Sequence, residues 1–279
     1  MTLVEAIVLG LVQGLTEFLP ISSTAHLRIV PAVLHRLDPA RPWNDPGAPA
    51  SAVIQLGTLA AVLGYFWREV IELTGAFVRA LARGRPCETF PARLAWMLGL
   101  GTIPIVIGGL ACEPFILTHA RSLRVIIGAL IGLALLLLLA ERVSRRDREL
   151  RDVTARDAVL IGLAQALALI PGASRSGTTI TAGLFLGFTR EAAARFSFLL
   201  SIPSVALSGL YELYAIRHQL AGAYSVSLLV ATVVAGVSGY LAIEFLLRYL
   251  RTHTTYLFVV YRLTLGLVLL VLLKFGLIQ

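Results

Sequence analysis

A polar, helix-breaking motif occurs twice in an otherwise apolar sequence. Residues 10–24 read GLVQGLTEFLPISST, and residues 162–178 read GLAQALALIPGASRSGT. Both motifs begin Gly-Leu-x-Gln, continue to a proline and end in a cluster of hydroxyl side chains. Proline and glycine interrupt helices, and a backbone interrupted inside a bilayer must find hydrogen-bond partners within the protein. The duplicated motif therefore predicts a polar site formed between two halves of a membrane protein.

Composition places the chain among membrane proteins. Hydrophobic residues make up 57% and charged residues 14% of the 279 residues, and the mean hydropathy is +0.83. A soluble domain of this length is much more polar. The formal net charge of +8 comes from arginines in short segments between apolar runs. Such segments are typical of topology signals, so we expect a lipid bilayer and no nucleic acid as the partner.

Six apolar segments are long enough to cross a bilayer, which requires about 20 residues of helix. Arginine-rich loops at 68–93 and 141–156 predict cytoplasmic ends, and the proline-rich loop at 36–49 predicts an external one. The six predicted spans cover approximately residues 50–67, 94–112, 123–140, 196–216, 225–247 and 257–276.

The two motifs lie outside these spans, in stretches 1–35 and 157–188 that are apolar but broken at their centres. We interpret each stretch as a re-entrant hairpin of two half-helices, the first entering from outside and the second from the cytoplasm. A hairpin with three spans, followed by an oppositely oriented hairpin with three spans, is an inverted repeat. Ordinary kinked spanning helices at both motifs are the alternative.

The expected fold is thus an all-α polytopic membrane protein, an inverted-topology repeat with two re-entrant helical hairpins and six full transmembrane helices. We expect a single integral membrane domain over residues 1–279. Its parts are repeat 1 at about 1–140, a cytoplasmic arginine-rich loop at 141–156 and repeat 2 at about 157–279.

Arg175 is the costliest side chain of the motifs to place in a membrane. An arginine at the bilayer centre costs roughly 2.5–3.5 kcal/mol, so it needs a compensating partner. It follows Pro171, at a point where a new half-helix would begin and free backbone N–H groups attract anions. A guanidinium among hydroxyl groups suits a phosphate. The alternative is an ion pair with Glu17 that only holds the halves together. The candidate phosphate-binding residues are Ser22, Ser174, Arg175, Ser176 and Thr179.

Ser23 and His26 are three residues apart and share one face if the chain is helical there. A serine oxygen beside an imidazole is the minimal arrangement of nucleophile and base. Hydroxyl clusters also cap helices, and a lone histidine is commonly a hydrogen-bonded core residue, so this pair gains its weight from the arginine in the other motif. The candidate catalytic residues are Glu17, Ser23, His26 and Arg175.

Glu17 has three open roles, as general base, metal ligand or counterion of Arg175. In diphosphate chemistry a carboxylate commonly holds Mg²⁺ or Ca²⁺, which bridges phosphate oxygens. Gln13 lies one helical turn earlier on the same face and can offer a carbonyl oxygen. The candidate metal ligands are therefore Glu17 and Gln13, and the sequence does not choose between the two cations.

These motifs resemble those of the undecaprenyl-diphosphate phosphatase family, also called bacitracin resistance proteins. The run from Gln13 to His26 resembles the family's (Glu/Gln)-x-x-x-Glu motif, with Gln13 where many members have glutamate. The run from Pro171 to Thr179 matches Pro-Gly-x-Ser-Arg-Ser-x-x-Thr at every fixed position. The resemblance covers the whole chain in length and order.

The resemblance implies an integral enzyme of the bacterial inner membrane that removes the terminal phosphate of undecaprenyl diphosphate. The product is the lipid carrier for peptidoglycan and other envelope polymers. The resemblance also implies a divalent cation and a site that faces the periplasm. We expect a polyprenyl diphosphate as the substrate, and the oligomeric state is open, with a homodimer as one outcome.

The residues predict phosphoryl transfer between the hairpins, with Ser23 as nucleophile and His26 as its base. A water molecule activated by His26 or Glu17 is the alternative nucleophile. The rival function is a secondary transporter or flippase of a lipid phosphate, because inverted repeats with broken helices are also a transporter architecture. The combination of Ser, His, Arg and Glu exceeds what binding an anion requires, which favours the enzyme.

Overall fold

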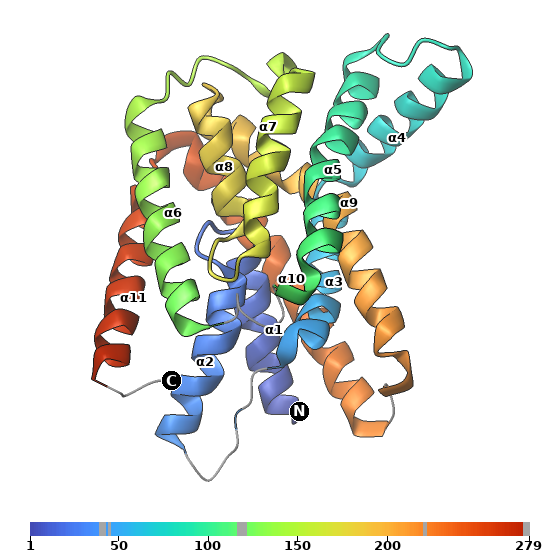
Figure 1. Ribbon diagram of the computed structural model, residues 1–279. Helices are drawn as coiled ribbons and strands as arrows, with labels where there is room; N and C mark the ends of the chain where they lie inside the picture. The colour runs from blue at the N-terminus through green and yellow to red at the C-terminus, as the bar shows by residue number, and fades with distance from the viewer. Residues whose placement is uncertain (39–42, 44–45, 116–121, 220–221, 276–279) are drawn as a thin grey trace.

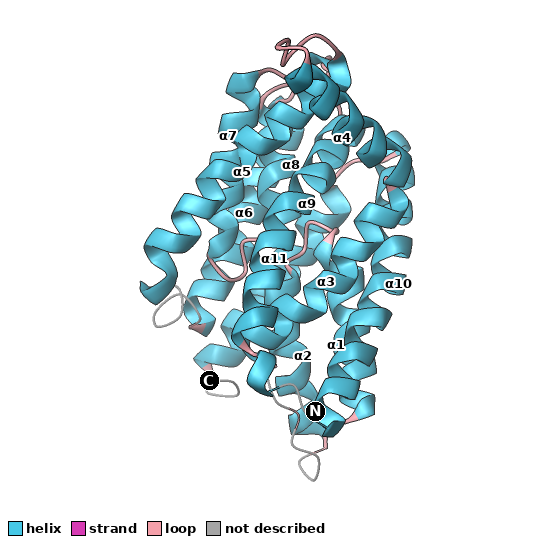
Figure 2. Cartoon of the chain, turned by 90° about the vertical axis from the view of Figure 1, so that its right-hand side faces the viewer, coloured by secondary structure: helices cyan, strands magenta, loops and turns pink. Residues whose placement is uncertain are grey.

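The chain folds into helices joined by short connections (Figures 1 and 2). The computed structural model describes residues 1–38, 43, 46–115, 122–219 and 222–275. Part of the predicted external loop, residues 39–42 and 44–45, lies outside the described residues. The α-helices are α1 (Leu3–Glu17), α2 (Ser23–Leu37), α3 (Gly47–Tyr65), α4 (Trp67–Ala82), α5 (Phe90–Phe115), α6 (Leu123–Val143), α7 (Ala155–Ala166), α8 (Arg175–Phe185), α9 (Arg190–Ala215), α10 (Gly222–Thr252) and α11 (Tyr256–Lys274).

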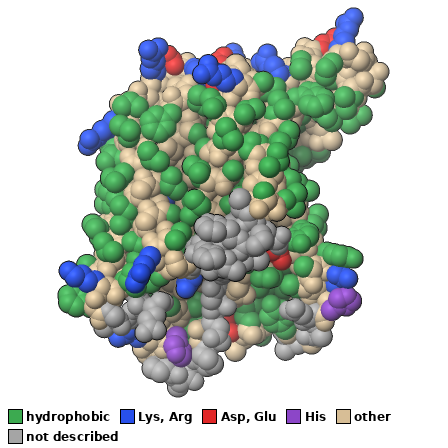
Figure 3. Space-filling view, viewed as in Figure 1, with side chains coloured by type: hydrophobic (Ala, Val, Ile, Leu, Met, Phe, Trp, Pro, Cys, Tyr) green, Lys and Arg blue, Asp and Glu red, His purple; other side chains and the backbone are tan. Residues whose placement is uncertain are grey.

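Among the described residues, six helices are long and apolar enough to cross a membrane, namely α3, α5, α6, α9, α10 and α11. This number confirms the six predicted spans. In Figure 3, hydrophobic side chains cover the middle of the visible face, and Lys and Arg side chains gather mainly toward its two ends. Such a distribution is that of a multi-pass membrane protein.

The segment predicted as a cytoplasmic loop at 68–93 contains an additional helix, α4. Its buried residues Leu73, Ala76 and Ala80 recur at helical spacing, and Ala76 and Ala80 pack against Ala92 of α5. Charged side chains keep this segment too polar for a span, but its apolar period still specifies an amphipathic helix. The prediction of a loop was wrong because it rested on the arginine content of the segment and did not consider the helical spacing of its apolar residues.

Each polar motif forms two short helices joined by a non-helical break. The first break lies between Glu17, which ends α1, and Ser23, which begins α2. The second lies between Ala166, which ends α7, and Arg175, which begins α8, and it includes a 3₁₀ turn. In Figure 1, α1 and α2 occupy the lower half of the molecule and α7 and α8 the upper half. The two breaks therefore come from opposite ends toward its middle.

The first arm of each pair begins in the same way. Thr2 caps α1 and forms a capping box with Glu5, and Thr154 caps α7 and forms one with Asp157. In a capping box, each partner satisfies a backbone N–H group that the first turn of the helix leaves free. Both arms thus have a well-defined start at a polar end of the molecule.

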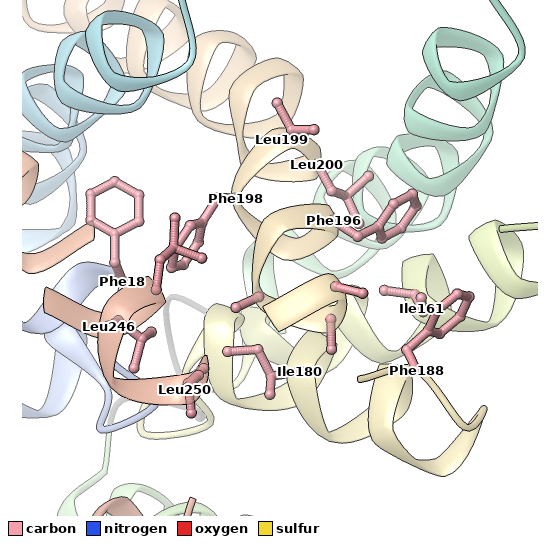
Figure 4. Close-up of a cluster of buried hydrophobic side chains, with 14 of the residues drawn as sticks. Phe18, Ile161, Ile180, Phe188, Phe196, Phe198, Leu199, Leu200, Leu246 and Leu250 are labelled. Carbon is pink, nitrogen blue, oxygen red and sulfur yellow. The ribbon is translucent and has the colours of Figure 1, made fainter. Parts of the chain in front are cut away.

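A buried apolar cluster fixes the first break against the second half of the chain. Phe18, which directly follows Glu17, packs edge-to-face on Phe198 of α9, with ring centroids 5.2 Å apart and an angle of 78° between the planes (Figure 4). Ile180 of α8 belongs to the same cluster. This cluster therefore places the end of α1 beside α8 and α9.

Candidate active site

The two breaks lie against each other, so the structure brings both polar motifs to one place. Ser176 Oγ donates a hydrogen bond to the carbonyl oxygen of Leu19 at 3.0 Å. The backbone N–H of Gly172 donates to Thr24 Oγ1 at 3.2 Å. Each contact joins one break to the first turn of the helix that follows the other break. The duplication of the motif in the sequence predicted that the two motifs lie together.

Glu17 is the centre of a buried hydrogen-bond network. Its side chain is 2% exposed, and its Oε1 accepts from Arg175 Nη2 at 2.5 Å and from Gln55 Nε2 at 2.6 Å. Its Oε2 accepts from Gln13 Nε2 and from Ser23 Oγ, both at 2.7 Å. A guanidinium and three neutral donors thus compensate the burial of a carboxylate charge, which would otherwise be strongly unfavourable.

Arg175 is the first residue of α8 and has the partner that a buried arginine requires. Its side chain is 12% exposed, against 2% for Glu17, so the guanidinium is the more accessible member of the pair. A planar guanidinium at the start of a helix, where the helix dipole also favours negative charge, is suited to a phosphate. The ion pair with Glu17 also agrees with the alternative, in which the pair only holds the two halves together. The contacts of the neighbouring residues distinguish this structural role from phosphate binding.

A serine in a strained backbone conformation begins the second arm of each pair. Ser22 has φ of 77° and Ser174 has φ of 70°, in the left-handed region that favours glycine. The Ser22 hydroxyl accepts from the N–H of Ala25 at 3.4 Å and the Ser174 hydroxyl from the N–H of Gly177 at 3.1 Å, so both serines cap their helices. Non-glycine residues persist in this region only where the surroundings enforce it, which occurs frequently at functional sites.

His26 is buried, and both of its ring nitrogens have partners. Nδ1 lies 2.7 Å from the carbonyl oxygen of Ser22, and Nε2 lies 2.6 Å from the hydroxyl of Tyr261 in α11. A carbonyl oxygen can only accept, so Nδ1 carries the proton, and Nε2 of the neutral ring accepts from Tyr261. The hydroxyl of Ser23 donates to Glu17 instead. The geometry thus pairs Ser23 with a carboxylate, where the sequence suggested the imidazole.

The predicted phosphate-binding hydroxyls of α8 also hold the helix in place. Thr179 Oγ1 lies 2.8 Å from the carbonyl oxygen of Arg175, to which it donates, and 2.6 Å from Ser197 Oγ of α9. Ser176 donates to Leu19 across the two breaks. Their role as phosphate ligands stays a prediction, and the structure shows them fastening α8 to its neighbours.

The chemistry of the donors limits how a metal could bind. Within the part of the chain that the structure describes, no group of three or more His, Cys, Asp and Glu side chains is placed to hold an ion. Glu17 is the one carboxylate of the network, and the amide of Gln13 lies beside it. Mg²⁺ is commonly bound by one or two carboxylates together with substrate phosphates. Glu17 and Gln13 offer one carboxylate and one amide, so a cation bound there would take its remaining ligands from the substrate.

Three site residues were missed by the sequence reasoning: Gln55, Tyr261 and Arg262. Each is a polar residue inside a predicted span, and Arg262 is completely buried. The rule that drew attention to Arg175, that a charge at membrane depth marks a site, applies equally to Arg262.

Known proteins are similar to this chain over nearly its whole length. Residues 6–268 match the family model described as bacitracin resistance protein BacA. A Myxococcus xanthus protein named undecaprenyl-diphosphatase is 56% identical over 276 residues, which cover 99% of this chain and 91% of the relative. A protein of the same name from Chlorobium phaeovibrioides is 52% identical over 285 positions, with 99% of both chains covered. With its two polar motifs inside the matched range, the chain belongs to the bacitracin resistance protein family.

Proposed function

We propose that the protein is an undecaprenyl-diphosphate phosphatase, which hydrolyses undecaprenyl diphosphate to undecaprenyl phosphate and inorganic phosphate. The observation that carries this proposal is the convergence of Arg175, Ser23 and two amides on the single buried carboxylate of Glu17. An ion pair that only joined two halves would not need the serine. The relatives at 50–56% identity carry the corresponding name.

The arrangement supports a covalent route. In this proposal, the prenyl chain stays in the lipid and the terminal phosphate lies between Arg175 and Ser23. Ser23 Oγ attacks the terminal phosphorus and passes its proton to Glu17 Oε2, which lies 2.7 Å away. The bond to the bridging oxygen breaks, Glu17 gives the proton to that oxygen, and undecaprenyl phosphate leaves. Water then hydrolyses the phosphoserine, with Glu17 as base, to give inorganic phosphate and free serine. Direct attack by water activated by Glu17 is the alternative route.

Arg175 and the helix ends supply electrostatic stabilisation in this proposal. The negative charge of the transferred phosphoryl group spreads over its oxygens, and a fixed guanidinium can bind two of them. Ser22 and Ser174 cap the N-termini of α2 and α8, so both helix dipoles favour an anion there. His26, held by Ser22 and Tyr261, keeps the first turn of α2 in place.

We propose further that a divalent cation, Mg²⁺ or Ca²⁺, binds with the diphosphate, with Glu17 and the carbonyl oxygen of Gln13 as its protein ligands. The bound cation would neutralise charge on the phosphate oxygens.

We also propose that the fold is an inverted repeat with two re-entrant hairpins. Helix α1 packs on α10, the second span of the other half, and α7 packs on α5, again the second span of the other half. Likewise the first spans, α3 and α9, pack together, and so do the third spans, α6 and α11. These reciprocal contacts, with the matching capping boxes and strained serines, support a two-fold relationship.

The glycines that open the two motifs support the same relationship. A Cβ atom on Gly10 would lie 2.5 Å from the carbonyl oxygen of Ala231 in α10. One on Gly162 would lie 2.4 Å from the carbonyl oxygen of Gly101 in α5. Corresponding positions thus allow the same close helix approach in both halves.

The proposed location is the inner membrane, with the site open to the periplasm. The basic connections before α5 and after α6 lie at the top of Figure 1, which would be the cytoplasmic end. The pair α1 and α2 enters from the opposite end.

Phosphate release from undecaprenyl or farnesyl diphosphate by the purified protein in detergent tests the function. The assay would be run with Mg²⁺, with Ca²⁺ and with a chelator, beside the Arg175→Ala variant. We expect metal-dependent release that the variant lacks. If folded, monodisperse protein released no phosphate, a lipid-phosphate transporter would be supported instead, and translocation in liposomes would be measured.

A further inference from the structure

Arg262 of α11 is a completely buried arginine whose hydrogen-bond acceptors, among the described residues, are all backbone oxygens. Its side chain is 0% exposed, and it is the largest fully buried side chain of the described residues. Every acceptor that the structure assigns to it is a backbone carbonyl, at 3.1 to 3.2 Å. Burial of an arginine is expensive, and an arginine that served only packing would be replaced by an apolar side chain without loss.

Three of the five bound carbonyl groups belong to the two breaks. Nη1 donates to the carbonyl oxygen of Pro20 in the first break. Nη2 donates to the carbonyl oxygens of Gly172 and Ala173 in the second. Carbonyl groups in a non-helical segment have no partner within a helix, so they require one from elsewhere in the protein. The guanidinium of Arg262 provides hydrogen-bond donors for the carbonyl groups of both breaks.

The other donors of Arg262 tie this unit to α6. Nε donates to the carbonyl oxygen of Leu130, and Nη2 also reaches that of Ala129. The guanidinium therefore has a fixed orientation relative to the span next to α11. A planar group with five donors can hold three separate segments in this way, whereas a lysine ammonium cannot.

The bound carbonyls lie next to the strained serines. Ala173 directly precedes Ser174, and Pro20 lies two residues before Ser22. Both serines have φ values near 70–77° and require enforcement by their surroundings. Arg262 thus donates hydrogen bonds to the backbone close to both serines.

Gly177 provides the space for the guanidinium. A Cβ atom at this position would lie 2.7 Å from Arg262 Nη1. Gly177 follows Arg175 and Ser176 in the second motif. The phosphate chemistry does not require a glycine at this position, whereas the space that the Arg262 guanidinium occupies does.

We propose that Arg262 is a positioning residue that holds the two breaks in register and thereby sets the distance between Ser23, Glu17 and Arg175. This inference rests on the proposed phosphatase function. Arg262 acts on the site through the backbone of both breaks, and its hydrogen bonds reach neither Glu17 nor the phosphate-binding guanidinium.

The Arg262→Lys variant tests the inference, with Gly266→Ala as its matched control. A Cβ atom on Gly266, one turn further along α11, would lie 2.6 Å from Ile131 of α6. The control therefore disturbs the packing of α11 on α6 without reaching the breaks. We expect Arg262→Lys to lower kcat roughly 100-fold with little change in KM, because misplacement of reacting groups by about 1 Å has such an effect. Gly266→Ala should retain most of its kcat at a comparable loss in Tm.

Two results would overturn the inference. One is a wild-type kcat in Arg262→Lys. The other is an equal loss of kcat in Gly266→Ala at the same Tm. A double-mutant cycle adds a second check, because Gly177→Ala displaces the same guanidinium. The losses of Arg262→Lys and Gly177→Ala should then not multiply, and fully multiplicative losses would contradict a shared role.

Hydrogen exchange separates this inference from the proposed function. Arg262→Lys should speed amide exchange in peptides covering both breaks, 18–26 and 169–178, while Gly266→Ala should not. Unchanged exchange at either break would refute the positioning role. If wild-type protein showed no phosphatase activity, the proposed function would fail, and the exchange measurement would still decide the role of Arg262.

Discussion

Arg175 Nη2 lies 2.5 Å from Glu17 Oε1, and the contact joins residues 158 positions apart in the sequence. It connects the end of α1 to the start of α8, the two points at which the polar motifs break. An ion pair of this kind could be purely structural. The second oxygen of the same carboxylate, however, accepts a hydrogen bond from Ser23, the contact that the proposed covalent route requires.

The serine beside this carboxylate supplies the first prediction. Ser23→Ala should lower kcat/KM about 1,000-fold or more, because loss of a catalytic nucleophile removes the covalent route. Ser201→Ala is the matched control, since this buried hydroxyl in α9 binds only its own helix, at 2.6 Å from the carbonyl oxygen of Phe198. Phosphate release by each purified variant is the measurement. Near-normal turnover of Ser23→Ala would exclude the covalent route and leave direct attack by water.

Gln13 provides a prediction on the metal. Gln13→Glu places a second carboxylate beside Glu17, whose Oε2 lies 2.7 Å from Gln13 Nε2. Two carboxylates repel each other unless a cation lies between them, and ligand charge raises affinity for Mg²⁺ and Ca²⁺. We expect half-maximal activity at a cation concentration roughly tenfold lower.

The control for this metal titration is Gln165→Glu, the corresponding change in the second motif. Gln165 Nε2 donates to the carbonyl oxygen of Gly101 and lies in α7, away from the carboxylate network. Its cation requirement should stay that of the wild type. An unchanged requirement in Gln13→Glu would rule out Gln13 as a neighbour of the cation.

Much of this architecture was predictable from the sequence, because membrane spans depend on length and hydropathy alone. The six spans follow from apolar runs, and the meeting of the two motifs follows from their duplication and from the need to satisfy broken backbone. The ion pair between Glu17 and Arg175 was one of the alternatives that the sequence offered, but the contact between Glu17 and Gln55 was not predictable in this way. Gln55 reaches Glu17 from α3, and no spacing rule relates that residue to the motif.

The pairing of Ser23 shows a second limit of the sequence. Helical spacing placed Ser23 and His26 on one face, but spacing says nothing of which acceptor a rotating hydroxyl finds. The hydroxyl of Tyr261, which lies far along the chain, forms a hydrogen bond with Nε2 of His26. Only the tertiary structure shows that the hydroxyl of Ser23 donates its hydrogen bond to Glu17.

The close approach of helices α7 and α5 supplies a prediction on stability. Gly162→Ala should lower the free energy of unfolding by about 1–3 kcal/mol, because the added methyl group would lie 2.4 Å from the backbone oxygen of Gly101. Gly132→Ala in α6 is the control, since nothing lies within 4 Å of a Cβ there. Thermal unfolding in detergent compares the two. Equal midpoints would contradict the tight contact.

Asp157 supplies a prediction on pH. Burial on its own would raise the pKa of this carboxyl, but hydrogen bonds from Arg148 and Thr154 hold its pKa below the ordinary value of 3.8. The unfolded chain therefore binds the proton more readily. The contribution to stability is complete above pH 3.8 and is lost as the pH falls through the lower pKa of the folded state.

Thermal unfolding of Asp157→Asn between pH 7 and pH 3 checks this expectation. The variant should have a lower Tm than the wild type at pH 7, and the difference should narrow below about pH 4. Glu88→Gln is the control, because Glu88 forms an exposed pair with Arg85 and should affect neither value. A constant difference in Tm across this range would show that the charge of Asp157 is not the cause.

The exchanged double variant Glu17→Arg, Arg175→Glu tests most directly whether the pair is a catalytic site or a structural link. Phosphate release would be measured on protein shown to be folded and monodisperse, beside wild type and Arg175→Lys. The exchange keeps an ion pair between α1 and α8 but removes the carboxylate beside Ser23 and the guanidinium at the start of α8. We predict that phosphate release is abolished in the exchanged variant and strongly reduced in Arg175→Lys. Release by the exchanged variant near the wild-type rate would contradict the account and leave the pair a structural link.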